Sequence, residues 1–103
     1  MRRSHTAGTA AFLAALVLAS AAGASAPDAW AEFRTKVQAA CLKAAAPHIP
    51  TAKAVVDPFG SESYGLAVVT GTPKGGKQAV MMVCVYDKRS GKVEIGSELP
   101  LPR

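Results

Sequence analysis

The side chains with the richest chemistry in this chain gather in one short segment, which reads Gly60, Ser61, Glu62, Ser63 and Tyr64. Two hydroxyls, one carboxylate and one phenol lie within a segment that glycine bounds on both sides, a composition typical of a turn that enters a strand. These groups can donate hydrogen bonds to carboxylates of another molecule, and the aromatic ring adds rigid contact area. A bulged turn with the tyrosine packed inward is the structural alternative, and the sequence leaves both interpretations open.

The other polar residues form no pattern that predicts catalysis. No serine lies in a Gly-x-Ser-x-Gly elbow, and the acidic residues fall mostly in turns or on exposed strand positions, without a convincing acid pair. His48 has no cysteine, aspartate or glutamate at a spacing that suits a metal site. We therefore expect a protein that is not an enzyme and has neither a metal nor a cofactor.

Residues 71–78 match most of a phosphate-binding P-loop, with the sequence Gly-Thr-Pro-Lys-Gly-Gly-Lys-Gln. A P-loop needs serine or threonine after its lysine and a helix whose N-terminus holds the phosphate. Here Gln78 follows the lysine and opens a predicted strand. We interpret the segment as a long hairpin loop that presents Lys74.

The N-terminus has the composition of a secretory signal peptide. Arg2 and Arg3 precede an apolar core at residues 12–18, and residues 22–24 have the Ala-x-Ala form at which signal peptidases cut. We therefore predict a signal peptide over residues 1–24.

The remaining residues, 25–103, are predicted to form one small domain located in the periplasm. Cleavage after Ala26 is a weaker alternative, because proline comes directly after it. An uncleaved anchor is also weaker, because the apolar core is alanine-rich and shorter than the roughly 20 apolar residues that a spanning helix needs. We expect no membrane association after cleavage.

Cys41 and Cys84 are the only cysteines in the chain. In an oxidising compartment such a pair normally forms a disulfide, so we predict an intramolecular bridge; buried free thiols and an intermolecular bridge are the alternatives. Closing a loop of about 44 residues would stabilise the folded state by roughly 4 kcal/mol in the chain-entropy model.

The charge pattern does not suggest a nucleic-acid surface. Without Arg2 and Arg3, ten basic residues stand against seven acidic ones, a net charge of +3. The basic residues are scattered, and aromatic residues do not alternate with them. We expect a mildly basic exterior and no nucleic-acid partner.

Hydrophobic periodicity predicts one helix followed by several strands. The helical period covers residues 28–45 and ends before Pro47, and a period of two begins after it, with short turns between strands. The predicted strands are residues 53–56, 64–70, 78–86 and 92–98. This order predicts an α+β fold in which an N-terminal helix packs on a small antiparallel sheet of about four strands, stapled by one disulfide.

The third predicted strand is apolar on both faces. The face of Cys84 must meet the helix for the disulfide to form. The opposite face, with Met81, Val83 and Val85, then needs a second layer that the chain does not supply. A homodimer or a sheet that curls on itself would cover it, and we expect the homodimer.

Taken in order, several short motifs make the chain resemble the periplasmic inhibitors of c-type lysozyme. They are Ser-Glu-Ser-Tyr at residues 61–64, Cys-Val-Tyr-Asp-Lys at 84–88 and Val-Glu-Ile-Gly at 93–96, together with the cysteine pair. Ser61, Tyr64 and the pair Lys74-Gly75 fill positions of that family's pattern. Glu62 departs from it, because the membrane-bound relatives have glycine there. The mature domain is also shorter than theirs, so we do not expect their full barrel.

The resemblance implies binding rather than catalysis. A lysozyme cleft contains an acid and a carboxylate, and hydroxyl or ammonium groups held rigidly in the cleft would satisfy both and exclude substrate. The resemblance places Gly60, Ser61, Glu62, Ser63, Tyr64 and Lys74 in the target-binding surface. The alternative is a structural or envelope-associated periplasmic protein that has no lysozyme target.

Overall fold

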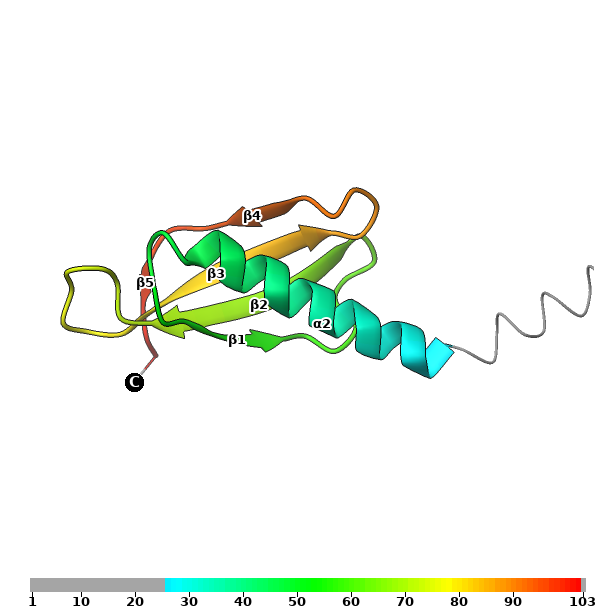
Figure 1. The fold of residues 1–103 in the computed structure, drawn as a ribbon, viewed down its shortest axis with the longest axis horizontal. Coiled ribbons are helices and arrows are strands. Elements are labelled where there is room, and N and C mark those ends of the chain that lie inside the picture. Colours follow the sequence, from blue (N-terminus) through cyan, green and yellow to red (C-terminus); the bar gives the residue numbers. More distant parts are fainter. Residues whose placement is uncertain (1–25, 103) are drawn as a thin grey trace, which may run out of the picture.

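The structure, a computed structural model, describes residues 26–102 and consists of one helix on one antiparallel sheet (Figure 1). The predicted signal peptide lies outside these residues. The elements are α2 (Ala26–Ala45), β1 (Lys53–Val56), β2 (Tyr64–Gly71), β3 (Val80–Asp87), β4 (Val93–Ile95) and β5 (Leu99–Pro100). Strands β1 to β4 are neighbours in chain order, and β5 pairs with β3 beyond the end of β4. The predicted α+β fold is confirmed.

Helix α2 begins two residues before the predicted start and ends at the predicted residue. Asp28 in the first turn and Lys43 in the last turn both complement the helix dipole. Val37, Cys41 and Ala45 recur every four residues and are fully buried, so this stripe faces the sheet. In the part of the chain that the structure describes, no helix combines the length and the apolar composition that crossing a bilayer requires.

The disulfide between Cys41 and Cys84 lies at the centre of the core. It joins α2 to β3 with a Cα–Cα distance of 5.9 Å, and both cysteines are fully buried. The residues buried with them in the core cluster are Val37, Ala45, Ala67 and Val69. The predicted intramolecular pairing is therefore confirmed.

The end of the sheet differs from the prediction because of one extra residue. Cys84 pairs with Ile95, whereas Met81 pairs with Leu99, so two residues of β3 lie opposite three residues of the returning chain. Such a β-bulge reverses the alternation of faces. Simple alternation along the predicted fourth strand puts Val93, Ile95 and Leu99 on one face, but in the structure Leu99 pairs with Met81 and lies on the face away from α2. The strand predicted over residues 92–98 is shortened to β4 (Val93–Ile95), and β5 (Leu99–Pro100) follows after the bulge, beyond the predicted end.

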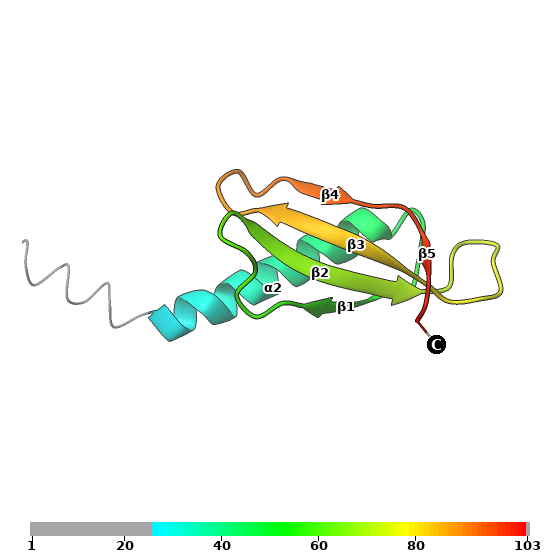
Figure 2. The same cartoon turned by 180° about the vertical axis from the view of Figure 1, so that it is seen from behind.

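The sheet has one covered and one uncovered face. Figure 2 shows the uncovered side, with α2 behind the sheet and no described helix or strand in front of it. We call it the open face. The strand register places on it Lys53, Val55, Tyr64, Leu66, Val68, Thr70, Met81, Val83, Val85, Asp87, Glu94 and Leu99. Val55 is 72% exposed, Val83 45% and Val68 38%. The third strand is thus apolar on both faces, as its sequence indicates, and only one of them is covered within residues 26–102.

Candidate functional site

Residues 60–64 form a closed turn, which we call the 60–64 turn. The backbone N–H of Ser61 donates to the carbonyl oxygen of Tyr64 at 2.8 Å. The backbone N–H of Tyr64 donates to the Ser61 Oγ at 3.1 Å, and that hydroxyl donates to the Tyr64 carbonyl at 3.3 Å. The Ser61 hydroxyl therefore holds the turn together, rather than standing free to meet a target.

Gly60 enables the turn through its backbone conformation. Its φ is 71°, in the left-handed region that residues with a Cβ rarely adopt. A Cβ at this position would also collide with the carbonyl oxygen of Tyr64. Both effects require glycine here.

Asp57 fixes the chain just before the turn. Its Oδ1 accepts hydrogen bonds from the backbone N–H groups of Phe59 at 3.1 Å and Gly60 at 3.0 Å. These bonds, that of Phe59 first, hold the pKa of Asp57 below its ordinary value of 3.8, and the positive charge of Lys88 lowers it further. The carboxylate is thus kept ionised in a role that organises the loop.

Lys88 clamps the turn from the β3–β4 hairpin. Its ammonium Nζ donates to the carbonyl oxygens of Phe59 at 2.9 Å and Ser61 at 2.6 Å. Its backbone N–H donates to the carbonyl oxygen of Ser63 at 3.0 Å. One residue therefore holds three carbonyl groups of a segment more than twenty residues earlier in the chain.

An aromatic cluster joins this clamp to α2. The Lys88 Nζ lies 5.3 Å from the ring centroid of Trp30 and 5.2 Å from that of Phe33, within the range of cation–π attraction. Trp30 packs edge to face against Phe33 at 5.5 Å and Phe59 at 5.1 Å. Helix, turn and hairpin therefore meet at one ammonium group.

The hairpin turn that carries Lys88 is also held by an aspartate. The Asp87 Oδ1 accepts from the backbone N–H groups of Arg89 at 2.8 Å and Ser90 at 3.1 Å. The hydrogen bonds from Ser90 and then Arg89 lower the pKa of Asp87. Two ionised aspartates thus organise the two loops that meet at Lys88.

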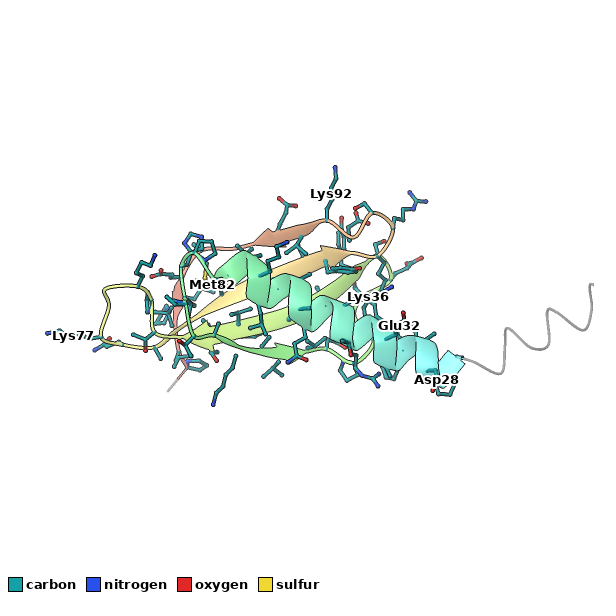
Figure 3. All side chains as sticks on the ribbon, in the orientation of Figure 1. Asp28, Glu32, Lys36, Lys77, Met82 and Lys92 are labelled. Atoms are coloured by element: carbon teal, nitrogen blue, oxygen red, sulfur yellow. A yellow bond between two sulfur atoms is a disulfide. The ribbon has the colours of Figure 1, made fainter. Side chains whose placement is uncertain are left out.

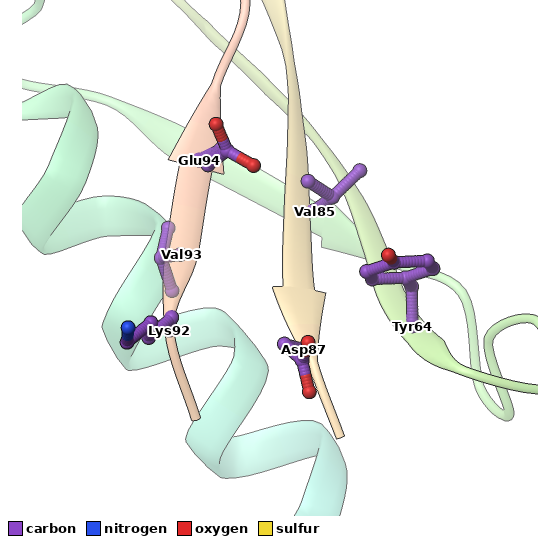
Figure 4. A pocket seen from close by; sticks show the side chains of 6 residues that line it. All are labelled: Tyr64, Val85, Asp87, Lys92, Val93 and Glu94. Atoms are coloured by element: carbon purple, nitrogen blue, oxygen red, sulfur yellow. The ribbon is translucent and has the colours of Figure 1, made fainter. Parts of the chain in front are cut away.

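The outward surface of the site centres on Tyr64. Its side chain is 44% exposed and lies on the open face, so the inward-packed alternative is wrong. Tyr64 lines two open hollows, of about 370 Å³ and about 440 Å³. Figure 4 shows the first, where Tyr64 and Val85 stand on the sheet surface with Glu94. Its lining residues are Tyr64, Val85, Asp87, Lys92, Val93 and Glu94. Glu62 and Ser63 line the second hollow and are also exposed.

The structure does not bring Lys74 to the 60–64 turn. Lys74 comes after the far end of β2, where its backbone N–H donates to the carbonyl oxygen of His48 at 2.9 Å. The eight residues of β2 separate the two loops by about 23 Å at ordinary strand rise. Figure 3 shows Lys77, from the same loop, at the opposite end of the molecule from Asp28. Gly60, Ser61, Glu62, Ser63 and Tyr64 lie together, without Lys74.

Lys88, the lysine that does lie at the turn, is not among the site residues predicted from the sequence. The register of the strands explains its position: β2 and β3 pair Tyr64 with Asp87, so the next residue, Lys88, lies opposite Ser63. The alternation of residues in the sequence does not contain this register. Nothing in the sequence indicates that Trp30 packs against Lys88 and Phe59, because these contacts depend on how the helix lies on the sheet.

The contacts around the 60–64 turn are hydrogen bonds, cation–π contacts and edge-to-face aromatic packing. Among residues 26–102, no three histidine, cysteine, aspartate or glutamate side chains are placed to hold a metal ion. Comparisons with protein-family models, with curated proteins and with solved structures found no match to this chain. The arrangement of the site itself therefore carries the functional argument.

Proposed function

We propose that this chain is a periplasmic protein that binds a c-type lysozyme and inhibits it by inserting the 60–64 turn into the active-site cleft. The observation that carries the proposal is the preorganised turn, clamped by Lys88, with Ser63 and Tyr64 exposed at its surface. The N-terminal composition and the disulfide support export to an oxidising compartment.

The exposed groups suit a cleft that contains an acid and a carboxylate. The Ser63 hydroxyl and the Tyr64 phenol are exposed and can donate hydrogen bonds to a target, whereas the Ser61 hydroxyl is used inside the turn. A turn that is already ordered loses little conformational entropy on binding, and this favours affinity. Ser61 therefore contributes by shaping the turn, and Ser63 and Tyr64 contribute by contact.

Charge assigns different roles to the remaining predicted residues. Residues 25–103 carry a net charge of +3, so the domain has no long-range electrostatic attraction to a lysozyme that is itself basic. Glu62 in the turn, with Asp87 and Glu94 beside Tyr64, supplies local negative charge for a basic cleft rim. Lys74 is at the far end of β2, so its contact with the target is peripheral.

The test is an assay of lysis of lysozyme-sensitive cells with the purified, oxidised mature domain. We expect inhibition by the wild type, a clear loss with Tyr64→Ala and little loss with Lys74→Ala. Lys77→Ala, at the tip of the distant loop, is the control and should inhibit fully. Thermal midpoints measured in parallel separate lost contact from lost folding.

The alternative, an envelope-associated periplasmic protein without a lysozyme target, is favoured by one observation. The open face leaves valines exposed across three adjacent strands, and such a surface on a small domain favours association with another molecule. Absence of inhibition at a large molar excess of the wild type would leave this alternative as the better account.

A further inference from the structure

We propose that two copies of this chain pack through their open faces, related by a two-fold axis that sets Lys53 of each copy against Glu94 of the other. This inference does not depend on the proposed lysozyme target. It rests on the apolar middle of the open face and on the position of the two charges at its corners.

The middle of the face is a continuous row of valines. The register pairs Val55 with Val68 and Val68 with Val83, so three side chains from three strands lie side by side. All three are exposed. Leu66 pairs with Val85 in the next row, so the apolar surface extends along the strands as well as across them. Single exposed valines are ordinary, but a contiguous patch of this kind marks an interaction surface.

Two charges of the open face, those of Lys53 and Glu94, occupy opposite corners of this patch. A third, that of Asp87, lies beside Tyr64 beyond the patch, where its carboxylate accepts hydrogen bonds from the backbone of its own hairpin turn. Lys53 on β1 lies in the row of Thr70 and Met81, at one edge of the sheet. Glu94 on β4 pairs with Val85, at the other edge and four residues further along β3. Three strand spacings separate the corners by about 14 Å across the sheet, and four residues separate them by about 13 Å along it. The line from Lys53 to Glu94 therefore crosses the strands at roughly 45°.

This diagonal makes the face complementary to itself. A two-fold axis in the plane of contact and perpendicular to the diagonal exchanges its ends, so both ion pairs form at once in an isologous interface. The same axis passes between Val68 and Val83 and places Val55 over the gap between Leu66 and Val85 of the second copy. Strands of the two copies then cross at close to a right angle, which is one of the two usual arrangements of packed sheets.

The available area favours a reversible dimer. The five strands have 4, 8, 8, 3 and 2 residues, which at ordinary strand dimensions gives a face of about 400 Å², or about 800 Å² in total for two copies. This area is small for a specific interface, so we expect a weak dimer that dissociates at micromolar concentrations or above.

The test is sedimentation equilibrium of the oxidised mature domain from about 1 to 500 μM. Lys53→Glu and Glu94→Lys should each raise the dimer dissociation constant about tenfold, because each reversal makes both ion pairs repulsive. The double variant Lys53→Glu with Glu94→Lys should recover the wild-type constant. Lys77→Glu, in the loop beyond the sheet, is the control and should leave the constant unchanged.

Three results would overturn the proposal. A wild-type protein that stays monomeric throughout the range contradicts self-association, and capture by lipid vesicles or another protein in that case identifies a different occupant. A double variant as weak as the single variants contradicts the pairing of Lys53 with Glu94. Val83→Asp should abolish the dimer with an unchanged circular dichroism spectrum, and a folded Val83→Asp variant that still dimerises contradicts the use of this face.

Discussion

The ammonium nitrogen of Lys88 lies 2.6 Å from the carbonyl oxygen of Ser61, although 27 residues separate the two in the chain. The same nitrogen contacts the rings of Trp30 and Phe33 on α2. The shape of the 60–64 turn is therefore set by tertiary contacts in addition to its own hydrogen bonds. A surface fixed in this way is suited to recognition, because binding does not have to order it.

Replacing Lys88 by methionine tests the clamp. Lys88→Met keeps the apolar stem but removes the donors to Phe59 and Ser61 and the cation–π contacts, so we expect a loss of about 1–2 kcal/mol in the free energy of unfolding. Amide hydrogen exchange at Ser61 and Tyr64, measured by NMR, should become faster. Lys92→Met, an exposed lysine of the same hairpin, is the matched control. Unchanged exchange in Lys88→Met would show that the turn holds its shape alone.

Two glycines of similar backbone conformation test the fit of the turn. Gly60 and Gly75 have φ values of 71° and 78°, but a Cβ at Gly60 would meet the Tyr64 carbonyl, whereas one at Gly75 would meet nothing within 4 Å. Gly75→Ala should lower the free energy of unfolding by about 1 kcal/mol, the strain of the left-handed region alone. Gly60→Ala should lower it by about 2 kcal/mol or more. Urea titrations would give both values, and equal losses would argue against the clash.

Periodicity in the sequence predicted α2 and strands β1 to β4 because apolar residues recur on at least one face of each. The buried stripe of Val37 and Cys41 and the alternation through Cys84 are local patterns, and the disulfide then required the helix to lie on that face of the sheet. The bulge before Leu99 was not predictable in this way. The bulge is defined by how residues 96–98 pair with β3: three residues there lie opposite two residues of β3. A pattern of alternating residues in the sequence does not specify this pairing.

Removing the disulfide should strongly destabilise the domain. The two sulfurs close a loop whose ends are 43 residues apart in the chain, and replacing both cysteines with alanine should lower the free energy of unfolding by about 4 kcal/mol. Urea unfolding of the oxidised protein, the reduced protein and the Cys41→Ala, Cys84→Ala double variant measures this. A reductant should destabilise the wild type and leave the double variant unchanged. Equal stability of all three would mean that the bridge contributes nothing.

Acid should loosen both loops of the site. The pKa of Asp57 and that of Asp87 are lower in the folded protein than the ordinary value of 3.8, so their contribution is present above that pH and is lost as the pH falls through the lowered values. The thermal midpoint of the wild type should therefore decrease when the pH is lowered below 3.8. In the Asp57→Asn, Asp87→Asn double variant the fall should be smaller. An identical pH profile in the two proteins would contradict this role of the aspartates.

The composition of the 60–64 turn identified it as a candidate site, but its internal organisation depends on partners far away in the chain. Glycine and serine predicted a turn, and that prediction needed no tertiary information. The Ser61 hydroxyl looked like a free donor because its bonds to Tyr64 exist only once the turn has closed. Lys74 looked like a member of the same site because spacing along the chain does not show that β2 runs between the two loops.

Isothermal titration calorimetry with a c-type lysozyme, with and without a chito-oligosaccharide in the cleft, shows whether the 60–64 turn binds at the active site. We expect one lysozyme bound per chain, competition by the saccharide, and a dissociation constant about 30-fold higher for Tyr64→Ala, the effect of losing a contact worth about 2 kcal/mol. Absence of binding, or binding that neither the saccharide nor Tyr64→Ala weakens, would contradict binding of the turn at the active site.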